Sequence, residues 1–182
     1  MKKNNFLLFF KKRRSIRCFI EKEIEKEKIL KIIKIFKYLP SSLNSQPWKI
    51  FIINNKEKIK EVGEKLSKIH KYSYPILNAP LIAIVTVDQD LSKKHFVEDG
   101  SIAAFSLWLA ASYLGLGSVW IAIYDPNSEE RENIVRKVFS IPKKYRIICI
   151  LPIGYPKEKP KKKQIRNINE IINFYNKRNL FI

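Results

Sequence analysis

The sequence predicts a single domain in which helices pack against a β-sheet around one buried helix. The run 100–124 contains no charged residue, although 29% of the chain is charged, so this run must be buried. Elsewhere, segments with apolar residues at helical spacing are followed by apolar segments of strand length. A chain of 182 residues can bury a sizeable core, and residues 1–182 are expected to form one domain.

The uncharged run could in principle cross a membrane, since a spanning helix needs about 20 apolar residues. Gly115 and Gly117 interrupt the run, and a glycine at such a place commonly ends a helix. Its flanks are acidic, whereas basic residues usually flank the cytoplasmic end of a span. We therefore predict a helix over 97–114 that lies in a core or a subunit interface, followed by a buried strand over 118–124.

The other elements are predicted from the spacing of apolar residues. Helices are expected over 6–12, 25–38, 55–71, 127–139 and 167–177. Alternating or continuous apolar residues predict strands over 48–53, 80–87 and 145–153. Pro40 ends the second helix, because the residue before a proline avoids the helical region. Asn127 is expected to cap the helix over 127–139, with Glu130 completing a capping box.

The net charge of +19 allows two interpretations. A strongly basic protein can bind nucleic acid or an anionic membrane surface. Here the basic residues are spread along the chain and many alternate with glutamate, which is typical of solvated helices. We expect no nucleic-acid or membrane partner. A basic nucleic-acid-binding module remains the alternative of another class, and it would need aromatic residues among the basic ones on an exposed surface.

Cysteine and histidine are too few for a metal site or a disulfide framework. The chain has only Cys18 and Cys149, with no CxxC pair, and only His70 and His95. The basic and apolar start imitates a signal peptide. Its apolar part, 6–10, is shorter than the 7–15 residues that a signal sequence needs, so we expect a cytoplasmic protein.

Two segments are candidates for ligand binding. Arg13, Arg14, Ser15 and Arg17 place three guanidinium groups and a hydroxyl within five residues. The planar fork of arginine matches phosphate oxygens, so this segment is a candidate phosphate site. The alternative is an ordinary basic surface segment.

The second candidate is the loop 40–48, which is polar and lies between two prolines that restrict its backbone. Ser41, Ser42 and Asn44 supply hydroxyl and amide groups that could pair with a polar heterocycle. The alternative is a loop without a ligand.

These two segments belong to a set of four that occurs in a recognisable order. The set consists of RRSIR at 13–17, PSSLNSQPW at 40–48, GLGSVW at 115–120, and LPIGYP at 151–156 with basic residues after it. Together they resemble the FMN-dependent nitroreductase family, over about 13–166. The resemblance implies an α+β fold, with a mostly antiparallel sheet and helices on both of its faces. It also implies a homodimer, with the helix over 97–114 at the interface and one FMN in each of two shared sites.

The resemblance also implies roles for particular residues. Arg13, Arg14, Ser15 and Arg17 match the first FMN segment; Arg13 and Ser15 face the phosphate and the ribityl chain, and Arg17 faces the pyrimidine edge. Ser41, Ser42 and Asn44 match the loop that reaches the flavin of the other subunit. Ala122 and Ile123 match the segment whose backbone N–H points at flavin N5. Arg166, with Lys163 as the other candidate, matches the C-terminal basic residues on the phosphate.

The implied activity is an NAD(P)H-dependent reduction of nitroaromatics, quinones or similar acceptors. FMN carries the hydride in such an enzyme, so no acid–base side chain is needed, which agrees with the scarcity of histidine. The sequence has neither a GxGxxG fingerprint nor a P-loop, so we expect no resident dinucleotide. Reductive dehalogenation and fragmentation of the flavin itself remain alternatives on the same fold.

Overall fold

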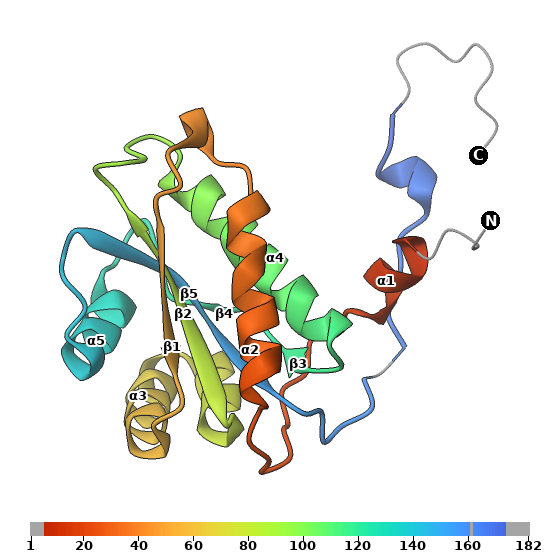
Figure 1. Cartoon of the computed structure of the whole chain (residues 1–182), viewed down its shortest axis with the longest axis horizontal. Helices are drawn as coiled ribbons and strands as arrows, with labels where there is room; N and C mark the ends of the chain where they lie inside the picture. The colour runs from red at the N-terminus through yellow and green to blue at the C-terminus, as the bar shows by residue number, and fades with distance from the viewer. Residues whose placement is uncertain (1–5, 161, 174–182) are drawn as a thin grey trace.

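The computed structural model describes residues 6–160 and 162–173 and has the predicted mixture of helices and antiparallel sheet (Figure 1). The five strands are β1 (Trp48–Ile53), β2 (Leu81–Asp88), β3 (Gly117–Ser118), β4 (Ile121–Ala122) and β5 (Tyr145–Gly154). The sheet has the order β1-β2-β5-β3, with β4 also paired to β5, and every named pair is antiparallel.

The two central strands are buried on both faces. All eight residues of β2 are buried, which explains why six of them are apolar. Successive side chains of a strand point to opposite faces. Accordingly, Ala83 and Val85 join the core under one helical layer, and Ile82 and Ile84 join the core under the other.

Helices cover both faces of the sheet (Figure 1). One layer contains α2 (Lys26–Ile33), η1 (Lys34–Tyr38) and α4 (Phe96–Tyr113). The other contains α3 (Lys56–Ile69), η3 (Lys71–Asn78) and α5 (Glu130–Phe139). The short helix α1 (Phe6–Lys12) lies against α4, where Phe9 meets Tyr113 edge-on at 5.6 Å between ring centroids.

Helix α4 is only half covered within this chain. Its small residues approach the sheet closely: a Cβ added to Gly100 would lie 2.4 Å from Ile148 Cγ1. On its other side, Phe105 is 40% exposed and Tyr113 is 75% exposed. Searched over the described residues alone, the structure has no helix that is long and apolar enough to cross a membrane.

The strand predicted over 118–124 is divided into β3 and β4. Ser118 pairs with Ile153 and Ile121 with Ile150, so the same register places Val119 opposite Pro152. Proline has no N–H to donate to the ladder, which accounts for the interruption.

Three helix predictions also needed correction. The helix expected over 25–38 is α-helical only to Ile33 and continues as the 3-10 helix η1. The predicted capping box is wrong: α5 begins at Glu130, Asn127 N–H donates to the Asp125 carboxylate, and the Ser128 hydroxyl accepts from Glu130 N–H. Within the described part of 167–177 only η4 (Ile168–Glu170) forms, and residues 174–177 lie outside it.

Candidate functional site

A basic cavity of about 530 Å³ brings the first motif together with the C-terminal basic segment. We call it the basic cavity. Its described lining residues are Arg13, Arg14, Ser15, Arg17, Tyr74, Glu158, Lys159, Pro160, Lys162 and Lys163. Lys163 therefore lines the same cavity as the motif. Arg166 is absent from these lining residues, and its Nε donates instead to Glu170 Oε2 at 3.2 Å.

The backbone of the motif is bound to the edge of the sheet. Ile16 N–H donates to Ser118 O at 2.9 Å, and Ser15 forms an isolated parallel bridge with Ser118. Gly117 makes this approach possible, because a Cβ there would lie 2.7 Å from the Ile16 side chain. The motif is thus held as an added edge segment, which fixes the direction of its side chains.

Glu158, another lining residue of the cavity, fixes the end of the motif. Its carboxylate accepts hydrogen bonds from the backbone N–H groups of Arg17 and Cys18. Lys157 N–H also donates to Cys18 O at 2.9 Å. The negative charge of Glu158 is therefore committed to backbone donors. Sequence reasoning missed this residue, because its contacts span about 140 positions of the chain.

Arg13 is a partly buried cation whose surroundings suit a bound anion. Its guanidinium lies over the Trp108 ring, 4.3 Å from the centroid. Its Nη1 is buried and has no acceptor among the residues the structure describes. Burial, and to a smaller degree the charge of Arg14, lowers the pKa of Arg13. Leaving a buried charged donor unpaired is unfavourable, so a phosphate oxygen at this place fits the site.

Tyr74 is a second lining residue that the sequence did not single out. It comes from η3 and is 41% exposed. Its hydroxyl can both donate and accept a hydrogen bond, which suits a polar heterocycle. A tyrosine in an aromatic loop gave no distinct sequence signal.

The polar loop lies away from the basic cavity within one chain. In Figure 1 the turn that contains η2 (Ser42–Asn44) lies beyond one end of α4, whereas the segment after α1 lies beside β3 at the other end. Ser41, Ser42 and Asn44 are therefore not brought together with Arg13 in this chain.

The loop is strained and firmly anchored. Leu43, Asn44 and Gln46 all have positive φ, at 51°, 53° and 46°. Asp99, 2% exposed in the first turn of α4, accepts from Ser42 N–H at 2.9 Å and from the Ser92 hydroxyl at 2.7 Å. Such strain persists only where the surroundings enforce it, and it is found disproportionately at functional sites.

The segment at Ala122 and Ile123 is held by hydrogen bonds on both sides of one peptide. Arg131 Nη1 donates to Ala122 O at 3.0 Å, and Arg131 also pairs with Asp125 at 2.6 Å. Ile123 N–H already donates to Ile148 O at 3.2 Å. The amide of Ile123 can therefore face a ligand only if this sheet bond is given up.

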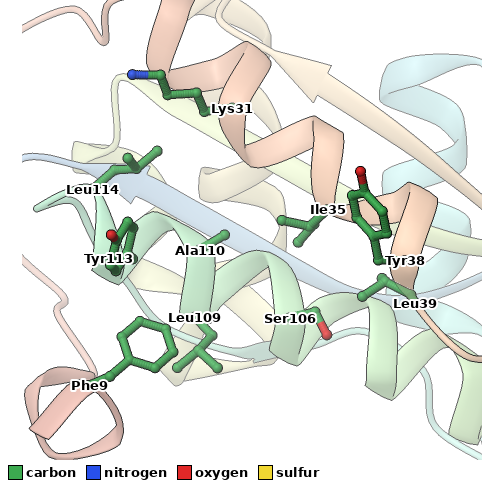
Figure 2. A pocket seen from close by; sticks show the side chains of 10 residues that line it. All are labelled: Phe9, Lys31, Ile35, Tyr38, Leu39, Ser106, Leu109, Ala110, Tyr113 and Leu114. Atoms are coloured by element: carbon green, nitrogen blue, oxygen red, sulfur yellow. The ribbon is translucent and has the colours of Figure 1, made fainter. Parts of the chain in front are cut away.

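An apolar groove of about 540 Å³ is lined by residues of α1, α2, η1 and α4 (Figure 2). Phe9 of α1 and Leu109 and Tyr113 of α4 form one side, and Ile35 and Tyr38 of η1 form the other. Tyr38 is 84% exposed, so this apolar surface is largely open in the single chain. Across the described residues, no group of three or more His, Cys, Asp or Glu side chains could hold a metal ion.

Comparisons with known proteins agree on one family. The profile described as Nitroreductase family matches residues 10–75 and 67–155. A provisionally named NADH dehydrogenase/NAD(P)H nitroreductase of Methanothermobacter thermautotrophicus is 36% identical over 160 residues, which are 87% of this chain and 81% of that protein. An iodotyrosine deiodinase of Thermotoga neapolitana is 29% identical, over 91% of this chain and 95% of its own. The crystal structure of an FMN-dependent nitroreductase of Clostridium difficile has a TM-score of 0.82 and 35% identity, over 94% of this chain and 99% of that one.

Proposed function

Because the chain belongs to the nitroreductase family, we propose that it is an FMN-dependent oxidoreductase that uses NAD(P)H to reduce small acceptors such as nitroaromatics or quinones. The observation that supports this most directly is the buried Nη1 of Arg13 in the basic cavity, which has no hydrogen-bond partner within residues 6–160 and 162–173. When bound, FMN supplies the hydride chemistry, and the protein supplies binding, orientation and electrostatics. Because NAD(P)H is the proposed electron donor, we place the protein in the cytoplasm.

Different residues of the basic cavity bind different parts of FMN in this proposal. Arg13, Ser15 and Lys163 bind the phosphate and the ribityl chain, since they line one cavity and supply cationic and hydroxyl donors. Arg17 lies at the pyrimidine edge, where a fixed cation stabilises negative charge that develops on reduction. Arg166 is better placed to support the backbone near Glu170 than to meet the phosphate.

The complete site requires a second copy of the chain. The open apolar groove and the exposed side of α4 offer a surface that a partner can bury, and Arg13 directly follows α1, whose Phe9 lines the groove. In a homodimer built on this surface, the loop at Ser41, Ser42 and Asn44 of one copy would serve the flavin of the other. The strained, anchored conformation of the loop would hold these polar groups ready for the partner's flavin.

Two outcomes separate this function from its same-fold alternatives. The purified protein should be yellow, release FMN on denaturation, and lose its flavin absorbance when NADH or NADPH is added anaerobically. Adding a quinone or nitroaromatic should restore the absorbance, and steady-state rates should give the parallel lines of a ping-pong mechanism. If FMN is bound but neither nucleotide bleaches it, the nitroreductase assignment is wrong, and dehalogenation or flavin fragmentation with another reductant takes its place.

A further inference from the structure

The basic cavity contains more positive charge than one FMN phosphate requires. Of its ten described lining residues, six are Lys or Arg, whereas these residues make up 36 of 182 in the whole chain. The composition of the protein therefore does not explain the local density. The one carboxylate among these ten residues, Glu158, is hydrogen-bonded to two backbone amides.

The proposed function uses only part of this charge. A phosphate monoester has a charge of about −1.5 to −2 at neutral pH, which Arg13 and Lys163 can balance. Arg17 is assigned to the pyrimidine edge. Arg14 has interactions of its own, so Lys159 and Lys162 are left. Both are exposed, line the basic cavity, and form no ion pair with any carboxylate that the structure describes.

The segment that carries these two lysines is attached to the motif just before Lys159. They follow Glu158, whose carboxylate holds this segment against the motif, and Pro160 between them restricts the backbone. Exposed charges act over roughly 8 Å at physiological ionic strength, so cations at a cavity mouth attract an anion that enters it. Lys159 and Lys162, both exposed lining residues of the basic cavity, thus form a cationic rim.

We propose that this rim selects NADPH over NADH as the electron donor, by attracting the additional 2′-phosphate of NADPH. The inference rests on the proposed function, because it concerns the donor that reaches the same flavin. The two nucleotides deliver the same hydride and differ only in this phosphate, so the chemical step is common to both. The discrimination is electrostatic and must weaken as salt is added.

The test compares the two donors in the FMN-loaded enzyme. We expect kcat/KM for NADPH to exceed that for NADH by about tenfold at low ionic strength, since each exposed pair contributes modestly. The ratio should fall as NaCl is raised to 0.5 M. In the double variant Lys159→Gln/Lys162→Gln, kcat/KM should decrease about tenfold more for NADPH than for NADH.

An equilibrium measurement removes any dependence on turnover. Titration calorimetry with NADP⁺ and NAD⁺ should show tighter binding of NADP⁺, and the double variant should lose that difference. The matched control is Lys68→Gln/Lys137→Gln, which removes the same charge from exposed positions on α3 and α5. It should retain the NADPH preference.

Three results would overturn the inference. They are equal or better use of NADH at low salt, a preference for NADPH that salt does not weaken, and an equal loss of preference in the control variant. A bound flavin that neither nucleotide bleaches would instead overturn the proposed function, and this inference with it.

Discussion

Replacement of Arg13 by alanine is the most direct test of the basic cavity. The buried Nη1 of Arg13 has no acceptor in the described chain, so a bound phosphate would give it at least one charge-assisted hydrogen bond. Such a bond is worth about 1.5–3 kcal/mol, which corresponds to roughly one to two decades in the dissociation constant. We expect Arg13→Ala to weaken FMN binding by this factor, measured by flavin fluorescence titration of the apoprotein.

Two controls isolate the phosphate contribution. Riboflavin lacks the phosphate, so the same substitution should change its affinity far less. Lys12→Ala removes an equal charge from the exposed last residue of α1, which is not among the residues that line the basic cavity, and it should leave FMN binding nearly intact. Equal losses for FMN and riboflavin, or an equal effect of Lys12→Ala, would refute the role assigned to Arg13.

The stability of the apoprotein gives an independent measure of the same argument. Burial lowers the pKa of Arg13, so the charged side chain is held in place at some cost while no anion is present. We expect Arg13→Ala to leave the apoprotein at least as stable, and to reduce the rise in Tm that saturating FMN produces, because that rise follows the binding constant. A marked loss of apoprotein stability would show that Arg13 acts mainly in packing on Trp108.

Three further predictions follow from other parts of the structure. Glu132→Gln should destabilise the fold by about 3–5 kcal/mol in urea unfolding, because the fully buried Glu132 carboxylate pairs with Arg136 and Arg146. As a control, Glu61→Gln, which breaks exposed ion pairs, should cost less than about 1 kcal/mol. Light scattering should give twice 21.5 kDa, and Leu109→Lys in the apolar groove should produce a monomer with weakened FMN binding. Burial, with a smaller effect of Arg131, lowers the pKa of His70 below its value in the unfolded chain. The free energy of unfolding should therefore fall as the pH drops below about 6.5, and His70→Asn should remove the contribution of His70 to this pH dependence.

The spacing of apolar residues correctly predicted the elements whose bounds depend on their own sequence alone. The strand predicted over 48–53 has these bounds in β1, and the helix over 55–71 differs from α3 by one or two residues at its ends. Periodicity failed where a distant residue decides the outcome. The break between β3 and β4 comes from Pro152 in the neighbouring strand, which no inspection of 118–124 could reveal.

The same distinction applies to the site. Arg13, Ser15 and Arg17 are adjacent in sequence, so the pattern of donors could be recognised directly, and Lys163 was a candidate from the resemblance. Trp108 and Glu158 support the motif from parts of the chain that are about 95 and 140 residues away. Residues of this kind contact other protein groups and leave no local pattern, so only the folded chain identifies them.

Helix α4 connects the two halves of the proposed site. Near its N-terminus, Asp99 holds the strained loop through Ser42 N–H, and nine residues later Trp108 supports Arg13. Nine helical residues span about 14 Å, so the two attachment points are separated by a fixed distance on one rigid element. Leu43, at the tip of the loop, is fully exposed in the single chain and has φ of 51°, a conformation that costs about 1–3 kcal/mol. A loop held in this way at the far end of α4 lies away from the basic cavity of its own chain, and in the proposed homodimer a second copy packed along α4 would cover the exposed apolar surface and receive the strained loop.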